Sequence, residues 1–468
     1  MNDTPPPVFL QWLRWPLNAI QSLLRIFNSK EKGSTIFPNS PTVIPRDQHT
    51  ISRKNISRPA LNVLYGLHEA GFEAYLVGGC LRDLLTGIQP KDYDVVTNAT
   101  PEQVKSVFRR SRIIGRRFRL VHVYFGREII EVATFRSSHG EQEESNDLSH
   151  SKSGRILRDN VYGTMEDDVV RRDFTINALY YNIDGFTLHD YTNSLQDINA
   201  GVIRLIGDPE TRYREDPVRM LRAARFAAKL GFSIEPNTKA PIKPLAHLMQ
   251  QIPPARLFDE TNKIFLSGHG VKSLAALREY DLFKTLFPAA NKHLLNEDSS
   301  FPALLEYALA NTDERIEDGR PVSPAFLFAV VMWPEVQRRQ IDKLQNGLPP
   351  VVAMTQAASE TISEQVQTIA IPRRFSTMVR EIWEMQERLP RRQGQRAFRL
   401  LAHPRFRAAY DFLLLREQAG EIPPGLGEWW TTFQNVKESE RKDMVAALRG
   451  SRGARGGKRR RRRPRAKQ

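Results

Sequence analysis

The pattern of apolar and polar residues changes at about Pro209. Before it, short apolar runs rich in β-branched and aromatic residues predict β-strands: "AYLVGG", "DYDVVT", "RLVHVYF" and "EIIEVATFR". After it, strand patterns nearly vanish, and apolar residues recur at helical spacing to about Leu448. The pattern predicts an α+β protein, in which a small α/β head is followed by an all-helical neck and body.

Two helices are predicted where the head meets the neck. In "DPVRMLRAARFAAKLGF", Asp216 is the expected N-cap, Pro217 the first helical residue and Gly231 the stop. "RRDFTINALYYN" also predicts a helix, preceded by Arg171 and Arg172. Both segments place several charged residues within about two helical turns.

Composition divides the chain further. Residues 28–58 are rich in Ser, Pro, Asn and Lys, and are predicted to be a linker. A stretch rich in Ser, Glu, His and Lys between Ser137 and Asn160 is predicted to be a mobile loop. The predicted order is an N-terminal segment with linker (1–58), the α/β head (59–208), a helical neck (209–270), a helical body (271–448) and a disordered basic tail (449–468).

Charge is concentrated at the C-terminal end. The formal net charge is +16, and Ser451–Gln468 alone contains ten Lys and Arg residues and no acid. Such a run is solvated, and its usual partner is a polyanion, although a plain solubility tail is the alternative. The single cysteine, Cys80, excludes an intramolecular disulfide and is typical of a protein of the reducing cytoplasm.

The N-terminal stretch "VFLQWLRWPLNAIQSLLRIF" is apolar but interrupted by polar residues. No apolar run of the chain reaches the roughly 18 residues of a membrane span. The stretch places Leu17, Ile20, Leu24 and Phe27 on one helical face. It predicts a surface helix that contacts a membrane periphery or a partner protein, or one that docks on its own chain.

The stretch "YLVGGCLRDLLTGIQPKDYDVV" contains the strongest candidate chemistry. Residues i and i+2 of a strand share a face, so Asp92 and Asp94 are expected to project together. A divalent cation between them relieves their repulsion, and Mg²⁺ (or Mn²⁺) completes its shell with water and phosphate oxygens. Gly78 and Gly79 expose backbone N–H groups at the end of a strand, where a polyphosphate can bind within reach of Arg82. Together these features predict a metal and nucleoside triphosphate site.

The second motif adds polar groups from "RRDFTIN". In the predicted helix Asp173 and Asn177 are four residues apart, so they share a face and could hold a ribose. Arg172 directly precedes them. Simple helix capping by Asp173 is the alternative interpretation.

The third motif lies in "YREDPVRMLR". Arg219 follows Glu215 by four residues and Asp216 by three, and Arg222 lies about one turn further on. A carboxylate beside a guanidinium can read the edge of a base. The alternative is a salt bridge at the start of a helix, with Asp216 acting only as its cap.

These motifs resemble those of the class II nucleotidyltransferases of the DNA polymerase β superfamily, which comprise bacterial poly(A) polymerases and tRNA CCA-adding enzymes. The resemblance runs from about Arg53 to Arg278. It implies a polymerase β-like head in which Asp92 and Asp94 are the catalytic metal carboxylates and Asp173 is the acidic residue of the second motif. It also implies that "EDPVR" recognises the base.

The resemblance implies that an RNA 3′-hydroxyl attacks the α-phosphate of a nucleotide and releases pyrophosphate, with metal ions neutralising charge. Either Asp173 or Glu131, on a neighbouring strand, is expected to complete the metal shell. We expect RNA 3′ ends, ATP and RNA-decay proteins as partners, and a monomer in the cytoplasm.

Three features favour a template-independent poly(A) polymerase over a CCA-adding enzyme. Arg116, Arg117 and Arg119 are expected beside the head, where they suit RNA. The segment 373–407 interleaves ten arginines with aromatic residues, which predicts RNA stacking or, alternatively, an ordinary helix with a basic face. The Arg-rich tail suits a substrate that is recognised by charge. A catalytically dead RNA-binding protein is the third hypothesis, and the intact carboxylate pair argues against it.

Overall fold

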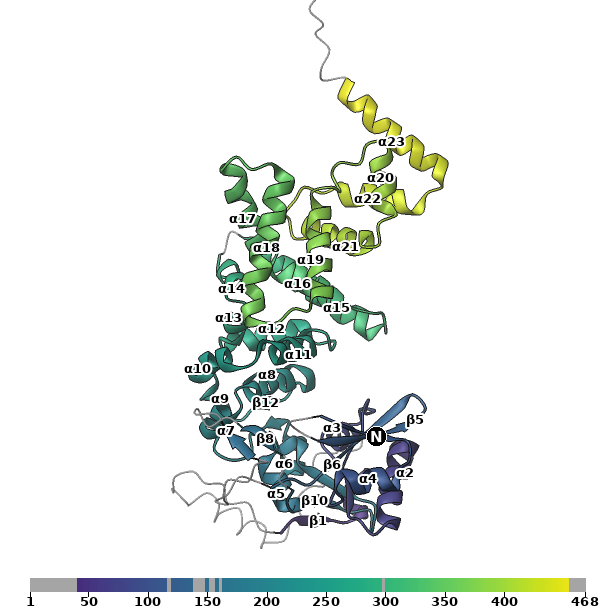
Figure 1. Cartoon of the computed structure of the whole chain (residues 1–468), viewed down its shortest axis with the longest axis vertical. Helices are drawn as coiled ribbons and strands as arrows, with labels where there is room; N and C mark the ends of the chain where they lie inside the picture. Colours follow the sequence, from purple (N-terminus) through teal and green to yellow (C-terminus); the bar gives the residue numbers. More distant parts are fainter. Residues whose placement is uncertain are drawn as a thin grey trace, which may run out of the picture. The chain divides into compact units, whose positions relative to one another are not determined.

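The computed structural model describes residues 40–115, 119–137, 148–150, 156–159, 162–296 and 299–453, all within one compact unit that starts at Asn39 (Figure 1). Within these ranges every helix is too short or too polar to span a bilayer. The N-terminal helix expected at 17–27, the arginines Arg116 and Arg117, and the tail from residue 454 on lie outside the described residues.

Eight strands form one mixed sheet in the head, in the order β1-β10-β9-β2-β3-β6-β5-β4. β3 and β6 pair in parallel, and the other neighbours are antiparallel. All four strands predicted from the sequence are confirmed, as β2, β3, β5 and β6. The strands are β1 (Thr42–Ile44), β2 (Ala74–Val77), β3 (Asp94–Thr97), β4 (Ser111–Ile114), β5 (Leu120–Phe125), β6 (Glu128–Thr134), β9 (Leu179–Asn182) and β10 (Leu188–Asp190).

Two shorter strand pairs lie outside this sheet. β7 (Leu148–His150) and β8 (Ile156–Asp159) pair antiparallel within the stretch 137–160 that was predicted to be a mobile loop, and the other residues of that stretch, from 138 on, lie outside the described residues. β11 (Val202–Ile203) and β12 (Ser233–Ile234) pair in parallel and connect the end of the head to the neck.

The predicted linker contributes to the head from residue 42 on. β1 pairs with β10, with Thr42 opposite Asp190. Ile51 and Ile56 are buried in the main core. A linker was therefore the wrong interpretation for residues 42–58, because isolated apolar residues in a polar stretch give no periodic signal.

Helices cover both faces of the sheet. Among the described residues, every regular element after Ile234 is a helix. The helices of the head and neck are α2 (Arg58–Glu69), α3 (Gly79–Leu85), α4 (Pro101–Val107), α5 (Met165–Arg171), α6 (Ser194–Ala200), α7 (Pro209–Glu215), α8 (Val218–Leu230), α9 (Pro236–Lys239), α10 (Ile242–Leu245) and α11 (Pro254–Phe265), with the 3-10 turns η1 (Arg46–Gln48), η2 (Arg53–Asn55), η3 (Thr175–Asn177) and η4 (Ala246–Gln251).

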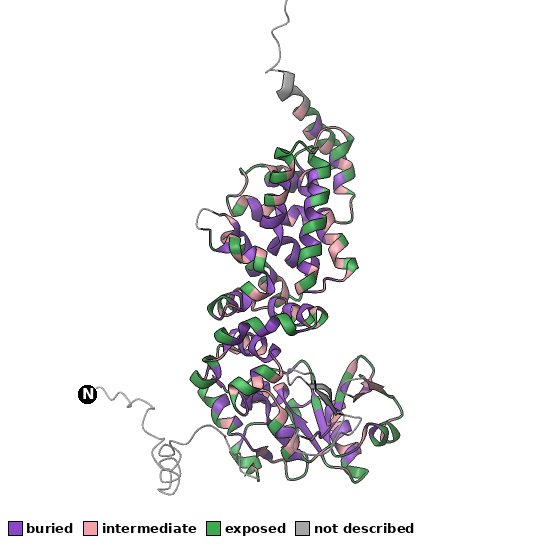
Figure 2. Ribbon diagram, turned by 60° about the vertical axis from the view of Figure 1, so that its left-hand side comes forward, coloured by how far each residue is buried: buried purple, intermediate pink, exposed green. Residues whose placement is uncertain are grey.

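The two faces of the sheet carry different cores. Leu76, Val95 and Val132 belong to the main core, on the face that α2 and α4 cover. Tyr75, Val77, Val96 and Tyr180 pack with Met165 and Val169 of α5 on the opposite face. Because alternate residues of a strand point to opposite faces, β2 and β3 are buried on both sides. In Figure 2 buried residues accordingly fill the strands.

The helix predicted for "RRDFTINALYYN" is wrong. α5 ends at Arg171, η3 forms a single turn, and β9 follows in the middle of the sheet. Tyr180 and Tyr181 are both almost fully buried, one on each face. A short apolar run that is buried on both sides cannot be distinguished from a helix by periodicity.

The helix predicted for "DPVRMLRAARFAAKLGF" is confirmed as α8, with one change. Its N-cap is Pro217, whereas Asp216 follows the last residue of α7; the Asp216 side chain accepts the Val218 N–H at 3.3 Å, and its carbonyl accepts the Arg219 N–H at 3.0 Å. Gly231 ends the helix in the left-handed region, with φ 70°. That conformation favours glycine because it has no Cβ.

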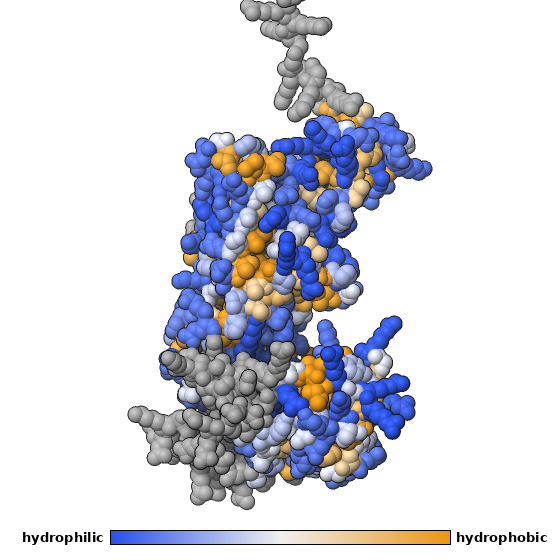
Figure 3. Space-filling view, viewed as in Figure 1, coloured by the Kyte–Doolittle hydropathy of each residue, from blue (hydrophilic) through white to orange (hydrophobic). Residues whose placement is uncertain are grey.

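The body continues the main core and ends in a second one. The main core runs from β1 to α21, and a separate apolar cluster joins α19 to α23. Ile341, Leu344, Val351 and Val352 leave an exposed apolar patch around the α17–α18 connection (Figure 3). The helices of the body are α12 (Gly270–Glu279), α13 (Leu282–Leu286), α14 (Pro288–Leu294), α15 (Phe301–Glu317), α16 (Pro324–Val331), α17 (Trp333–Gln345), α18 (Pro350–Thr368), α19 (Arg373–Gln386), α20 (Gln395–Leu401), α21 (Phe406–Gln418), α22 (Leu426–Asn435) and α23 (Glu438–Gly453).

The aromatic residues of segment 373–407 belong to these cores. Trp383 is fully buried and donates its ring N–H to Ala329 O at 2.9 Å. Phe406 is buried too, and Phe375 and Phe398 pack partly buried against the two cores. The structure therefore decides against base stacking by these rings and for helices with an apolar inner face.

Candidate active site

The glycine turn joins β2 directly to α3. Gly78 has φ 85°, a left-handed value that favours glycine, and Gly79 is the first residue of the helix. A Cβ at Gly79 would lie 3.1 Å from a terminal nitrogen of Arg82. A Cβ at Gly78 would lie 3.6 Å from Oδ2 of Asp94. The bare turn therefore borders both the arginine and one carboxylate of the predicted pair.

The carboxylates lie at the same end of the sheet. Asp94 is opposite Val77 on one side and opposite Glu131 on the other. Asp92 precedes the strand, and both aspartates are exposed while Tyr93 between them is buried. The Tyr93 hydroxyl donates to Asn55 O at 2.9 Å, which fixes the alternation that directs Asp92 and Asp94 away from the main core.

Partial burial and the neighbouring carboxylates raise the pKa of Asp94. Partial burial makes the largest contribution, followed by the charge of Glu131, and the pKa rises to about 6 although Arg172 opposes the change. A carboxylate with this pKa is costly to keep ionised, so it favours a cation beside it. The closest carboxylate neighbour in register is Glu131, which the sequence named only as an alternative.

Arg172 is held next to this cluster by buried partners. Its Nε donates to Asp168 Oδ2 at 3.0 Å and to the Tyr180 hydroxyl at 2.8 Å. Burial opposes ionisation of Asp168, yet Arg172 and Arg171 hold its pKa below the usual value. Asp168 and Tyr180 were not identified from the sequence, because these residues position Arg172 and belong to none of the three motifs.

Arg82 and Asp173 both contact Asn177. Arg82 donates to Asn177 Oδ1 at 2.6 Å and to its own neighbour Asp83 at 2.6 Å. Asn177 Nδ2 donates to Asp173 Oδ1 at 3.3 Å. Asp173 and Asn177 were predicted to share one face of an α-helix; they do lie side by side, but a single 3-10 turn brings them together.

Asp173 is neutralised within the protein. Arg222 of α8 donates its Nε to Asp173 Oδ2 at 2.6 Å, and the Phe174 N–H donates to Oδ1 at 2.8 Å. Despite burial, Arg222 holds the pKa of Asp173 below its usual value. Asp173 is thus paired with an arginine, whereas Glu131 lies opposite Asp94 and contacts only the imidazole of His122, at 3.2 Å, among the ion pairs of the described residues.

The third motif is divided between two ion pairs. Glu215 Oε2 accepts from Arg219 at 3.0 Å and from Arg212 at 2.7 Å. Asp216 instead receives two hydrogen bonds from Arg256 of α11, at 2.9 and 2.7 Å. Arg256 stands 40 residues away in sequence, so the motif alone could not reveal it.

Arg225 is a further basic residue that the motifs did not single out. The guanidinium carbons of Arg82, Arg222 and Arg225 lie 5.4, 5.5 and 4.6 Å from the ring centroid of Phe226. Within the described residues Arg225 Nε has no hydrogen-bond partner, and burial, then Arg222, lowers the pKa of its side chain. The signal was its spacing, since arginines recur every three residues from Arg219.

Three family models match the chain. They are described as poly A polymerase head domain (residues 74–204), probable RNA and SrmB- binding site of polymerase A (231–294) and polymerase A arginine-rich C-terminus (346–467). Poly(A) polymerase I of Salmonella typhimurium is 51% identical over 412 residues, which covers 87% of this chain and 89% of the relative. The chain belongs to the poly(A) polymerase family.

More distant similarity extends to enzymes of the second group that the motifs suggested. A CCA-adding enzyme of Limosilactobacillus fermentum is 39% identical over 225 residues, which is 48% of this chain and 54% of the relative. The Bacillus stearothermophilus CCA-adding enzyme, solved with CTP, aligns over 84% of both chains with a TM-score of 0.53 and 22% identity. The nucleotidyltransferase fold expected from the sequence is confirmed.

The donor set of this poly(A) polymerase family member fits a hard cation that also binds its substrate. Among the described residues no three His, Cys, Asp or Glu side chains are arranged closely enough to hold a metal by themselves. Mg²⁺ does not need such a cage, because one or two carboxylates, water and substrate phosphates complete its shell. Asp92 and Asp94, both exposed beside the bare glycine turn, are carboxylates that could hold such a cation.

Arg119 lies on the same sheet, at the start of β5. Its guanidinium donates to Glu102 of α4, and both side chains are at least one-third exposed. The other two arginines of the predicted RNA-binding set, Arg116 and Arg117, precede it outside the described residues.

Proposed function

We propose that this protein adds AMP from ATP to RNA 3′ ends without a template and releases pyrophosphate. The observation that carries the choice of activity is the 51% identity with poly(A) polymerase I over 87% of the chain, whereas CCA-adding relatives match only about half of it. In the cell the activity serves RNA processing and decay in the cytoplasm. We further propose that the enzyme acts as a monomer.

Asp92 and Asp94 would hold the catalytic Mg²⁺, or Mn²⁺ in its place. When bound, the metal supplies positive charge that activates the 3′-hydroxyl and neutralises the triphosphate. Glu131 lies beside Asp94 and is the better candidate for a third carboxylate, because Asp173 is already neutralised by Arg222. Asp173 then acts by holding Arg222 and Asn177 in place for the ribose.

The triphosphate is received by backbone and guanidinium groups. The N–H groups of the Gly78–Gly79 turn face an anion without a side chain in the way. Arg172 and Arg225 add positive charge. Arg172 is held in place by Asp168 and Tyr180. The Nε of Arg225 has no hydrogen-bond partner within the described residues, so it can donate to a phosphate. Arg82 connects the turn to Asn177, so it aligns the phosphate and ribose subsites.

The base is selected by Glu215, Asp216 and Arg219 at the start of α8. Glu215 orients Arg219, and Arg256 orients Asp216. A fixed carboxylate can accept a hydrogen bond from the edge of adenine, and a fixed guanidinium can donate one to it. A base whose donors and acceptors are arranged the opposite way is rejected. RNA is held by Arg116, Arg117 and Arg119 and by the basic tail through its phosphates.

The deciding experiment offers the purified protein two RNAs, a tRNA lacking its terminal CCA and an unstructured oligonucleotide. Each RNA is incubated with each nucleoside triphosphate separately. We expect ATP to be strongly preferred and long A-tracts to grow on the unstructured RNA. Addition of C, C and A to the tRNA followed by arrest would instead identify a CCA-adding enzyme, and RNA binding without any transfer would identify a dead one.

A further inference from the structure

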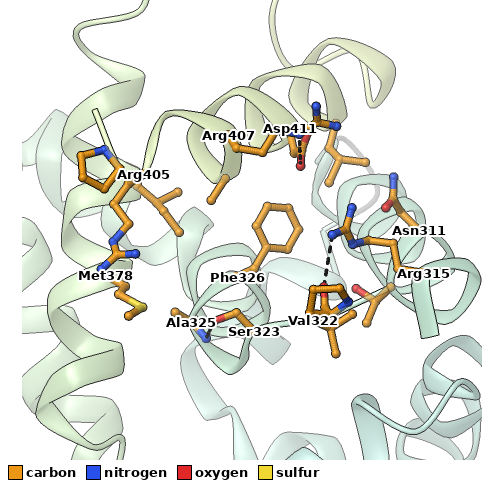
Figure 4. A pocket seen from close by; sticks show the side chains of 16 residues that line it. Asn311, Arg315, Val322, Ser323, Ala325, Phe326, Met378, Arg405, Arg407 and Asp411 are labelled. Carbon is orange, nitrogen blue, oxygen red and sulfur yellow. Dashed lines mark hydrogen bonds and ion pairs between the residues drawn. The ribbon is translucent and has the colours of Figure 1, made fainter. Parts of the chain in front are cut away.

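A cavity of about 250 Å³ lies in the body between α15, α16, α19 and α21, far along the chain from the active-site motifs. None of its lining residues belongs to the candidate active site. In Figure 4 the ring of Phe326 stands at its centre, with Arg315 on one side and Arg405 on the other. Met378 and Ile382 of α19 complete an apolar wall.

The Phe326 ring is held in place by a neighbouring ring, but one part of it is exposed to the cavity. It packs edge-to-face against the buried ring of Phe412, at 6.3 Å between centroids and 83° between planes. The Phe326 side chain nevertheless stays only partly buried, because part of it borders the cavity. A rigid aromatic surface that opens onto a cavity is a platform for a flat ring.

The rest of the lining is basic. Three arginines stand against Asp411 in the lining and Glu381 beside it, which leaves an excess of one positive charge. Arg315 donates to Pro321 O at 3.1 Å, and Arg405 donates to Glu381 at 2.9 Å. Arg407 pairs with Asp411 at 2.9 Å and is 72% exposed. Solvent-exposed ion pairs of this kind are weak, so an anionic ligand can replace them.

We propose that this cavity binds one nucleotide of single-stranded RNA, with its base against Phe326 and its phosphates at Arg315, Arg405 and Arg407. The proposal rests on the proposed function, which supplies RNA as the substrate. The cavity is smaller than the roughly 300–1,000 Å³ of drug-sized sites, so it suits one flipped-out base.

The surrounding sequence supports a polynucleotide rather than an acidic peptide. Arg396 and Arg399 of α20 are exposed on the segment that leads to Arg405. Arginines that follow a backbone together with an aromatic platform for a base are typical of single-strand RNA binding. Arg396, Arg399, Arg405 and Arg407 of the segment 373–407 therefore contribute to RNA binding, while the stacking ring comes from Phe326 of α16.

A nucleotide bound here is remote from the reacting 3′ end. It is held equally before and during the reaction, so the cavity should raise RNA affinity without changing turnover. RNAs too short to reach from the active site to the cavity should gain nothing.

The test compares Phe326→Leu, Arg315→Gln and a control, Arg388→Gln, which removes an exposed arginine outside the cavity. Phe326→Leu keeps an apolar side chain and removes the stacking surface, and thermal unfolding checks that each variant is folded. We expect each cavity variant to weaken binding of a long oligoadenylate about tenfold without ATP present. The KM for ATP, the saturated turnover and the KM for a trinucleotide primer should stay unchanged, as should all values for the control.

Crosslinking identifies the bound species. A long oligoadenylate with a photoreactive adenine should crosslink within 311–326 or 404–415, and photoreactive AMP should not. Crosslinking by AMP alone, or unchanged affinity of folded variants for long RNA, would overturn the proposal. Loss of affinity in protein that transfers no AMP would refute the proposed function and leave the cavity assignment standing.

Discussion

Carboxylates have opposite surroundings in the head and in the helical body. In the head, Asp94 has Glu131 and Asp92 for neighbours, and its pKa is raised to about 6. In the body, Glu335 is buried and accepts hydrogen bonds from Arg338 and Arg339 at 2.7 Å each. Its pKa falls to about 2, because these bonds and one from His293 outweigh the effect of burial.

The difference separates charges that bind a ligand from charges that stabilise the fold. A paired charge such as Glu335 lowers the free energy of the folded chain. A cluster of like charges raises it, and the cluster persists only because the surrounding structure holds it in place. The large apolar core around the sheet provides that support. The uncompensated groups of the head are therefore the ones to test for catalysis.

The largest effect is expected from Asp94→Asn. The substitution removes a metal ligand and keeps the shape of the side chain, so AMP transfer should fall by at least about 10³-fold. Thermal stability should stay equal or rise, because repulsion from Glu131 is relieved. Asp342→Asn, on the exposed face of α17, serves as the control. Near wild-type transfer by folded Asp94→Asn protein with Mg²⁺ would contradict the site.

Glu335→Gln should show the reverse pattern. The free energy of unfolding at pH 7 should drop by up to about 3 kcal/mol, while transfer by the folded protein should be unchanged. Because the folded-state pKa lies below the ordinary value of 4.5, the stabilisation is present above pH 4.5 and is lost as the pH falls towards 2. Denaturant titrations of both proteins at several pH values should therefore converge in acid. If the free energies of unfolding of the two proteins changed in parallel with pH, the ion pairs of Glu335 would contribute nothing to stability.

The same comparison applies to cations. Arg225 has an unpaired Nε, whereas Arg339 is tied to Glu335. Arg225→Gln should raise the KM for ATP about tenfold, as expected for one lost contact to phosphate, without lowering stability. Arg339→Gln should lower stability and leave that KM unchanged. If the Arg225→Gln protein were less stable but had an unchanged KM for ATP, Arg225 would have a structural role and would not bind ATP.

Local patterns predicted the elements that have one buried face or clear end signals. The helix α8 and the strands β2, β3, β5 and β6 were predicted correctly for that reason. β9 was missed because Tyr180 and Tyr181 are buried on opposite faces. β1 was missed because the strand it pairs with, β10, lies more than 140 residues further along the chain.

Of the candidate site, the sequence predicted the residues better than their partners. The spacing of Asp92 and Asp94 correctly predicted that both are exposed while Tyr93 is buried, although Asp92 precedes β3 and only Asp94 lies in it. The pairing of Asp173 with Arg222, and of Asp216 with Arg256, depends on how α8 and α11 pack against the head. Tertiary packing of this kind leaves no periodic trace in the sequence.

The smallest effect is expected at Arg119, on the surface of the head. Its pair with Glu102 is exposed and contributes less than about 1 kcal/mol, so both Arg119→Gln and Glu102→Gln should leave the free energy of unfolding nearly unchanged. Only the first removes a cation that can bind RNA. If Arg119 contacts one phosphate of a single strand, its loss should flatten the slope of log K against log salt by about 0.7. RNA binding by the two variants and the parent protein at several salt concentrations measures that slope. Equal slopes for all three proteins would restrict Arg119 to its contact with Glu102 and assign the basic RNA contacts to other residues.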